Sequence, residues 1–496
     1  MPARGATRVD RLGRANRSTL LGSIVSAALG FVLLLVLTNG LGADDAGVVL
    51  VAVAAANIAI GAAVLGTDAA LVRYIATANR AGRGGQARRL TIVGAGPVAV
   101  AGAVLAVVGL ITAQPLAELM VEGAVRDDHV DSMRLAALVV PVAALSLSLL
   151  SATRGTGTMG PTVWLDQVLR PVAQVIALVV VVAGSFSVVA ATAAWLWPFA
   201  LSLTGAAAWL ALRLPPSDGS RVDAAGFWRF ALPQAGTGLL RVMIRWVDTL
   251  VVGALLGVEA AAIYTAATRL LKLGSIVNQA VFRAASPQIA EDLSVDDRHG
   301  AEAVFRTSAN WLVLATWPLY LTCLVFAPVI LRVFGDEFEA GAGAARILAG
   351  ALLVASACGP VESVLVMSGR SGLNLLNNVV ALAANIGFGL LLIPTWELEG
   401  AAVAWAISVG LTNLLPLAQV RHLLAMVPFD GVMARTGIGL VAAFGIGALA
   451  SLVVGGGVLG MVVGLAVAAA VAAPQIWRRR GELALRQLLA GEVATT

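Results

Sequence analysis

One short motif occurs in both halves of the chain: Leu41-Gly42-Ala43-Asp44-Asp45-Ala46-Gly47 near the start is echoed by Leu256-Gly257-Val258-Glu259-Ala260-Ala261-Ala262. Gly257 lies 215 positions after Gly42. The turns Arg154-Gly155-Thr156-Gly157 and Ser368-Gly369-Arg370-Ser371 form a second pair, in which Gly369 lies 214 positions after Gly155. Two matches at nearly one offset indicate an internal repeat, so we expect a fold made of two similar halves.

The composition predicts an integral membrane protein. Of 496 residues, 59% are hydrophobic and only 12% are charged, and the mean hydropathy is +0.91. In soluble domains about a quarter of all residues are charged. The apolar residues are mainly Ala, Val, Leu and Gly, which allow helices to pack closely in lipid.

Apolar runs of about 20 residues recur along the whole chain, each long enough to cross ~30 Å of hydrocarbon as a helix. We therefore predict an all-α integral membrane protein with about 14 transmembrane helices. The expected spans are residues 17–39, 47–73, 90–112, 132–153, 163–183, 188–211, 229–255, 260–283, 305–328, 343–367, 372–394, 400–423, 433–454 and 458–477.

The polar turn 214–220, rich in Pro and Gly, is the clearest linker. An even number of spans in each copy predicts two parallel six-helix lobes, related by a pseudo-two-fold axis along the membrane normal, around a central cavity. The predicted divisions are a basic N-terminus (1–16), an N-terminal lobe (17–213), an inter-lobe linker (214–226), a C-terminal lobe (227–424), two additional transmembrane helices (432–478) and a tail (479–496).

The charged breaks alternate between basic and acidic. Arginines gather in residues 73–89, 154, 213–229, 421–435 and 478–480, whereas acids dominate residues 44–45, 118–131, 259, 336–339 and 397–399. Because positively charged loops stay in the cytoplasm, we predict a multi-pass protein of the cell membrane with both termini cytoplasmic. The preference for Arg over Lys, with abundant Ala, Gly and Val, is typical of a high-GC bacterium.

Several cations fall inside predicted spans, where a charge at mid-bilayer costs ~2.5 to 3.5 kcal/mol. They must therefore face a cavity or a partner. They are Arg170, Arg241, Arg245, Arg269 and Lys272. For Arg170 and Arg245 the alternative is a structural ion pair with Asp166 and Asp248, each at helical neighbour spacing. For the other three cations no acid lies one turn away, which favours a ligand role.

Buried acids and amides complete the candidate site. Asp68 and Glu362, like Asp166 and Asp248, could bind a coupling ion or neutralise a nearby arginine. Amides expected to line the cavity are Gln174, Gln279, Asn374, Asn378 and Asn385. A cluster of arginines favours a permanently anionic ligand such as a diphosphate, whose oxygens accept bidentate hydrogen bonds from guanidinium groups.

The sequence lacks the motifs of metal binding, ATP binding and nucleophilic catalysis. Three His and two Cys predict no metal site, and the absence of a phosphate-binding Gly-rich loop excludes ATP-driven transport. We expect no cofactor and no nucleic-acid partner, since the net charge of +5 is explained by arginines in the turns. No nucleophile motif is present, so we predict no enzyme activity. Asp44 and Asp45 leave a membrane-embedded glycosyltransferase or polymerase as an alternative.

These residues together resemble the polysaccharide flippases of the multidrug/oligosaccharidyl-lipid/polysaccharide superfamily. The resemblance runs from about Arg17 to about His422, and no single motif decides it. It is carried by residues 41–47, 66–74 (GTDAALVRY), 264–270 (YTAATRL), 287–290 (PQIA), 334–338 (FGDEF), 368–370 (SGR), and 393–394 followed by 399–402.

The resemblance implies two six-helix lobes that move a polyprenyl-diphosphate-linked oligosaccharide to the outer leaflet by alternating access, for cell-surface polysaccharide biosynthesis. In the related lipid II flippases an arginine in a Tyr-x-x-x-x-Arg-Leu stretch engages diphosphate, which corresponds to Arg269. The run from Ser18 to Thr38 lacks the arginines of those flippases and the acid of the drug exporters. A multidrug or metabolite antiporter is the alternative transporter. The implied partners are the lipid bilayer, the lipid-linked glycan, and glycan polymerases or glycosyltransferases.

Overall fold

The computed structural model describes residues 3–121, 125–184, 187–216, 221–455 and 457–479, with only the backbone described for 3–21 and 270. Within these residues the chain is helical throughout, without strands. The protein is thus an all-α, multi-pass integral membrane protein, as predicted. Residues 217–220 of the predicted linker and 480–496 of the predicted tail lie outside the described residues.

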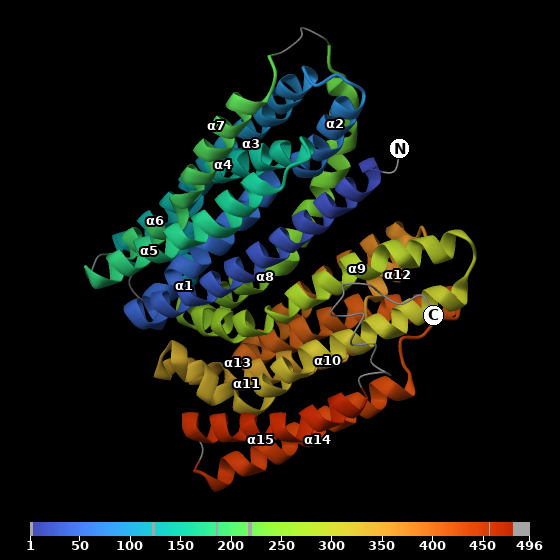
Figure 1. The fold of residues 1–496 in the computed structure, drawn as a ribbon. Helices are drawn as coiled ribbons and strands as arrows, with labels where there is room; N and C mark the ends of the chain where they lie inside the picture. Colours follow the sequence, from blue (N-terminus) through green and yellow to red (C-terminus); the bar gives the residue numbers. More distant parts are fainter. Residues whose placement is uncertain (1–2, 122–124, 185–186, 217–220, 456, 480–496) are drawn as a thin grey trace. The chain divides into compact units, whose positions relative to one another are not determined.

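The chain divides into two compact units, Met1–Ala262 and Ile263–Thr496. Figure 1 labels the helices. The first unit holds α1 (Ala3–Ala63), α2 (Thr67–Arg80), α3 (Gln86–Met120), α4 (Asp127–Gly155), a π-helical segment (Thr162–Leu169), α5 (Arg170–Ala183), α6 (Val188–Leu196), α7 (Pro198–Arg213) and most of α8 (Ala224–Leu271).

The second unit contains the end of α8 and all later helices. They are α9 (Gly274–Ser294), α10 (Arg298–Leu331), α11 (Ala342–Ala357), α12 (Val361–Met367), α13 (Ser371–Leu424), α14 (Gly431–Val453) and α15 (Gly457–Arg478), with short 3-10 turns at Arg332–Phe334 and Asp336–Gly341. Aspartates cap two of these helices: Asp297 accepts from the Gly300 amide (2.9 Å) and Asp430 from the Met433 amide (2.7 Å).

Eleven helical segments of the described chain are long and apolar enough to cross a membrane. Three of them, with 42, 46 and 54 residues, are about twice the length that ~30 Å of hydrocarbon requires. Each of the three contains one break in helical backbone, at Gly42 in α1, Gly257 in α8 and Glu397 in α13. Dividing them there gives 14 helices, the predicted number.

The two copies of the opening motif adopt the same backbone conformation. Gly42 has φ 76° and ψ 176°, and Gly257 has φ 82° and ψ 174°. This left-handed, extended conformation is almost restricted to glycine because a Cβ atom would clash with the backbone. Each glycine therefore ends one membrane helix and begins the next without a loop.

A second element of the repeat is a pair of hydroxyl groups that joins two helices, buried in the first unit and partly buried in the second. In the first unit Thr67 Oγ1 lies 2.7 Å from Ser148 Oγ, and in the second unit Ser286 Oγ lies 2.7 Å from Ser363 Oγ. Ser363 follows Ser148 by 215 positions, the offset of the opening motif. The same helix contact is thus built twice.

The second pair of turns has a register different from the one expected. Gly155 is the last residue of α4, whereas Gly157 (φ 87°) and Gly369 (φ 81°) share the left-handed conformation. The conformational counterpart of Gly369 is therefore Gly157, 212 positions earlier. Sequence matching chose Gly155 because both glycines stand in the same short turn.

Packing inside each unit follows the small and branched residues of the sequence. Leu71, Ile75 and Phe227 form a buried core in the first unit. In the second unit α14 and α15 lie side by side (Figure 1) and share a buried cluster with Leu321 of α10. Large apolar side chains elsewhere, such as Val453 at 88% exposure, remain at the surface, as lipid-facing residues do.

The boundary between the two compact units falls inside α8, after Ala262. The helix expected to open the C-terminal lobe, residues 229–255, therefore packs with the first unit. The predicted linker 214–226 and the other predicted divisions stay predictions. The assignment of six helices to each lobe remains a prediction.

Candidate functional site

The first unit contains a cavity of about 310 Å³ lined by α1, α2, α4 and α8. We call it the first-unit cavity. Its lining residues are Asn57, Ile60, Gly61, Val64, Gly66, Asp68, Leu147, Ser151, Arg154, Ala235, Gly238, Arg241, Val242, Arg245 and Trp246. Three of these side chains are guanidinium groups and one is a carboxylate, so the cavity has an excess of positive charge.

Helix geometry places the two arginines of α8 on one face. Arg241 and Arg245 are four residues apart, one helical turn, and both side chains are exposed at the cavity. Asp68 lies in the first turn of α2, where the helix dipole stabilises a carboxylate. In the structure Arg241, Arg245 and Asp68 line this cavity, and their role in binding stays a prediction.

Arg154 is a cavity residue that the sequence analysis assigned to a turn. It lies in the last turn of α4 and donates from Nη2 to Ser151 Oγ at 2.6 Å. Its Nε is buried and finds no hydrogen-bond acceptor among the described residues. A guanidinium donor left without an acceptor beside a cavity is suited to an anionic ligand.

Arg170 has a structural role in this conformation. Its Nε donates to Asp166 Oδ1 at 2.9 Å, and its guanidinium carbon lies 4.6 Å from the ring centre of Phe199. Both members of the ion pair are about one-fifth exposed. The ion-pair interpretation of Arg170 and Asp166 is thus confirmed, and neither residue lines the first-unit cavity as described.

Arg269 and Lys272 belong to the second unit. Lys272 lines a separate cavity there, and Arg269 is partly exposed near the end of α8. The five predicted cations therefore fall into four local environments. A single cluster of all five stays a prediction.

Asp248 and Gln174, two of the predicted polar residues on other helices, are engaged in hydrogen bonds. Asp248 is 6% exposed, and its Oδ1 accepts from the Thr249 amide at 2.8 Å. Gln174 Nε2 donates to the Trp195 carbonyl at 2.7 Å, which joins α5 to α6. Gln279 is exposed on α9.

On α13 the amides form a chain of contacts. Asn374 Nδ2 donates to Glu362 Oε1 at 2.9 Å, and Asn378 Nδ2 donates to the Asn374 carbonyl at 2.9 Å. Asn385 is buried at 5% exposure. Sequence analysis missed Asn377, which exchanges two amide hydrogen bonds with Gln419, at 2.8 and 3.0 Å.

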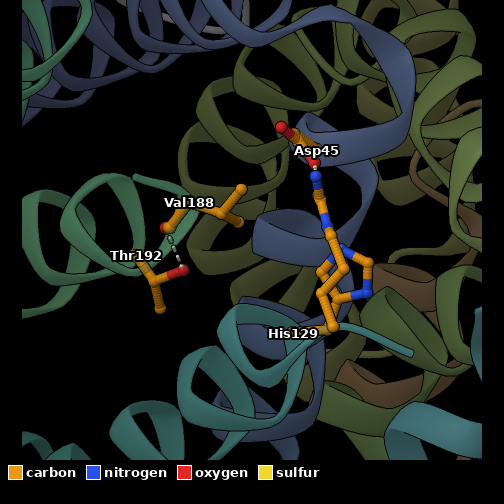
Figure 2. Close-up of polar contacts among 5 residues, drawn as sticks. Asp45, His129, Val188 and Thr192 are labelled. Atoms are coloured by element: carbon orange, nitrogen blue, oxygen red, sulfur yellow. Dashed lines mark hydrogen bonds and ion pairs between the residues drawn. The ribbon is translucent and has the colours of Figure 1, made fainter. Parts of the chain in front are cut away.

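A polar cluster joins α1 to the start of α4 (Figure 2), and its residues are not among those that line the first-unit cavity. Arg126 Nη2 donates to Asp45 Oδ1, and Arg126 Nε donates to His129 Nε2 at 2.8 Å. His129 is 3% exposed. In the same view Thr192 Oγ1 donates to the Val188 carbonyl of its own helix at 3.0 Å. Asp45 thus has a structural contact, which weakens its case as a catalytic acid.

The sequence model of the polysaccharide biosynthesis protein family matches residues 14–291, more than half of the chain. The chain belongs to this family. A second model, MatE, matches residues 233–391.

The chain is similar to a curated protein, the probable low-salt glycan biosynthesis flippase Agl15 of Haloferax volcanii. The two are 29% identical over 178 residues, which cover 34% of this chain and 36% of Agl15. The match therefore spans about a third of the relative's length.

Solved structures share the fold. The inward closed conformation of the lipid II flippase MurJ has a TM-score of 0.73 at 10% identity, over 92% of this chain and 98% of MurJ. An inward-facing multidrug resistance MATE transporter of the MOP superfamily has a TM-score of 0.67 at 16% identity, over 80% and 94%. A MOP superfamily transporter from Pyrococcus furiosus matches with a TM-score of 0.55 at 16% identity, over 84% and 95%.

Proposed function

We propose that this polysaccharide biosynthesis protein is a flippase that translocates a polyprenyl-diphosphate-linked oligosaccharide across the cytoplasmic membrane by alternating access. The first-unit cavity carries the proposal, because Arg154, Arg241 and Arg245 surround it against one carboxylate, Asp68. The printed functions of Agl15 and MurJ, a glycan biosynthesis flippase and a lipid II flippase, support the same class of cargo.

The chemistry of the cavity fits a diphosphate better than a cationic drug. A diphosphate offers several oxygens to the fork-shaped guanidinium donors, and each charge-assisted hydrogen bond contributes roughly 1.5 to 3 kcal/mol. A cation would meet three positive charges and one negative charge in a medium of low dielectric constant. Repulsion would therefore keep it out.

Asp68 gives the site a way to release its ligand. It lines the same cavity as Arg154, and its negative charge attracts the positive charge of the Arg154 guanidinium group. When the diphosphate leaves, this carboxylate partly neutralises the arginines. Arg269 and Lys272 of the second unit are proposed as further contacts with the cargo. The protein then needs no catalytic residue, because translocation breaks no covalent bond.

The proposal is tested with the purified full chain in liposomes, by measuring transfer of a fluorescent undecaprenyl-diphosphate glycan between leaflets. The double substitution Arg241→Gln and Arg245→Gln removes two charges and keeps hydrogen-bonding capacity. We expect transfer to fall by more than tenfold, since two charge-assisted contacts are lost.

Arg213→Gln is the matched control, because Arg213 is exposed in the last turn of α7 and does not line the cavity as described. Its transfer rate should equal that of the wild type. Unchanged transfer in the double variant would overturn the proposal. Export of organic cations by a wild type that moves no lipid diphosphate would favour the antiporter instead.

A further inference from the structure

The second unit has its own cavity of about 210 Å³, formed by α8, α9, α10, α11 and α13. We call it the second-unit cavity. Its apolar wall includes Leu312, Leu348 and Leu352, and its polar wall includes Lys272, Asn278 and Asn413. Trp405 of α13 also lines it and is partly exposed. At ~30 Å³ per water, the volume corresponds to about seven waters, which is too large for a bare ion.

The polar wall is built where α8 gives way to α9. The helix is interrupted at Lys272 and Leu273, and α9 begins at Gly274. A Cβ atom on Gly274 would lie 2.0 Å from the Tyr320 hydroxyl oxygen, so only glycine lets α9 begin against Tyr320. Ser275 Oγ donates to the Lys272 carbonyl at 2.6 Å, which fixes this turn. The fold thus holds Lys272 at the edge of the cavity.

Lys272 is the only lysine among the 33 lysines and arginines of the chain. A compact ammonium with three rotatable donors suits a single oxygen or a cluster of hydroxyls, whereas arginine suits the flat edge of a phosphate. The two cavities therefore differ in chemistry. Three guanidinium groups line the first-unit cavity, and one ammonium with amides and an indole lines the second.

The wall provided by α13 is preorganised. Asn413 Nδ2 donates to the Val409 carbonyl at 2.8 Å, and Thr412 Oγ1 donates to the same carbonyl at 3.0 Å. These bonds fix the Asn413 amide about two helical turns from Trp405, which is eight residues earlier on the same side of the helix and lines the same cavity. An aromatic face flanked by fixed amide groups is suited to a ring with an apolar face and polar edges.

We propose that the second-unit cavity binds one sugar ring of the transported glycan, with Trp405 packed on the ring face and Lys272, Asn278 and Asn413 bonded to its oxygens. This inference rests on the proposed flippase function and adds a subsite that reads the glycan. A lipid tail would match only the apolar wall, and a diphosphate would be held by one cation only. A single pyranose uses both walls.

The test compares lipids with and without a sugar. Native mass spectrometry of the full chain in nanodiscs measures binding of undecaprenyl diphosphate and of the same lipid bearing glucose, N-acetylglucosamine or glucuronate. The wild type should bind at least one sugar-bearing lipid about tenfold more tightly than the bare lipid, as one good aromatic contact with its hydrogen bonds allows.

Trp405→Ala should abolish this tenfold preference and leave the affinity for bare undecaprenyl diphosphate unchanged. Trp405→Phe should retain most of it, which separates loss of the ring contact from loss of folding. Trp164→Ala, at a tryptophan that is 68% exposed in the first unit, is the matched control and should bind like the wild type.

The outcomes separate the two proposals. A wild type that binds bare and sugar-bearing lipids equally, or a Trp405→Ala variant that keeps the preference, would overturn the sugar subsite and leave the flippase standing. A wild type that binds none of these lipids would overturn both.

Discussion

At the scale of single residues, Arg154 illustrates how a charge at a helix end becomes part of a site. In the sequence it ends an apolar run and looks like an ordinary loop cation. In the fold its Nη2 is held by Ser151 at 2.6 Å, and it lines the same cavity as Arg241 and Arg245. The buried Nε has no acceptor among the described residues, so a ligand oxygen would complete its hydrogen bonding.

Arg154→Lys is expected to lower the affinity for undecaprenyl diphosphate about tenfold, because lysine keeps the charge but loses the Nε donor and the bidentate geometry. Native mass spectrometry in nanodiscs measures the affinity. Arg213→Lys, at an exposed position, should leave it unchanged. Equal affinities of the Arg154→Lys variant and the wild type would remove Arg154 from the site.

The two motif glycines make a second prediction at this scale. Gly42→Ala and Gly257→Ala should each lower the free energy of unfolding by about 1–3 kcal/mol, because alanine is strained at φ 76° and 82°. Gly387→Ala, inside α13 with open space around its Cβ, should be neutral or stabilising by up to ~1 kcal/mol. Unfolding in detergent, followed by circular dichroism, gives the values. A Gly257→Ala variant with the free energy of unfolding of the wild type would contradict the left-handed backbone conformation at Gly257.

At the scale of elements, α13 shows how polar contacts hold membrane helices together. Its two arms meet at the break at Glu397, and Asn377 of the first arm exchanges two hydrogen bonds with Gln419 of the second. Asn377 is only 3% exposed. In lipid, where apolar contacts alone do not drive association, such a reciprocal amide pair fixes which faces of the arms meet.

Asn377→Leu and Gln419→Leu should each destabilise the protein by about 1–2 kcal/mol, because each leaves the partner amide buried without its bonds. The double variant should cost less than the sum of the two. A double-mutant cycle of unfolding in detergent measures this coupling. Strictly additive losses would show that the two amides act independently.

At the scale of the whole molecule, the two copies of the repeat agree in backbone and helix contacts but differ in the charge of their cavities. The break at Gly42 recurs at Gly257, and the hydroxyl pair Thr67–Ser148 of the first unit has its counterpart in Ser286–Ser363 of the second. The charge does not follow the repeat, because the first-unit cavity is rich in arginine whereas the second has one lysine. We interpret this asymmetry as binding of the diphosphate head group in the first-unit cavity and of a sugar ring in the second-unit cavity.

The predicted orientation can be tested by thiol labelling. The native cysteines, Cys323 and Cys358, are buried and unpaired, so the wild type should react slowly with a membrane-impermeant maleimide. In whole cells the maleimide should label a cysteine introduced by Asp128→Cys and should not label one introduced by Arg83→Cys. The reason is that acidic turns are predicted to lie outside the cell and basic turns inside it. The reverse pattern would invert the predicted topology and place both termini outside.

The sequence by itself determined the class of fold and its repeat. Apolar runs of membrane length occur about fourteen times. The Leu-Gly motif occurs twice, 215 positions apart, because glycine alone readily adopts the backbone conformation of that turn. It also led to the prediction that Arg241, Arg245 and Asp68 face a cavity, since charge in a membrane helix must turn away from lipid.

Tertiary structure alone decided which charges share a cavity and which are already paired. Arg170 is bonded to Asp166 and packed on Phe199, although its spacing in the sequence resembles that of Arg245. Arg154 of α4 lines the same cavity as Arg241 and Arg245 of α8, which no local pattern encodes. Helical periodicity shows which face of one helix must be sheltered. The side chains that shelter it come from other helices, distant in sequence, and only the fold brings them together.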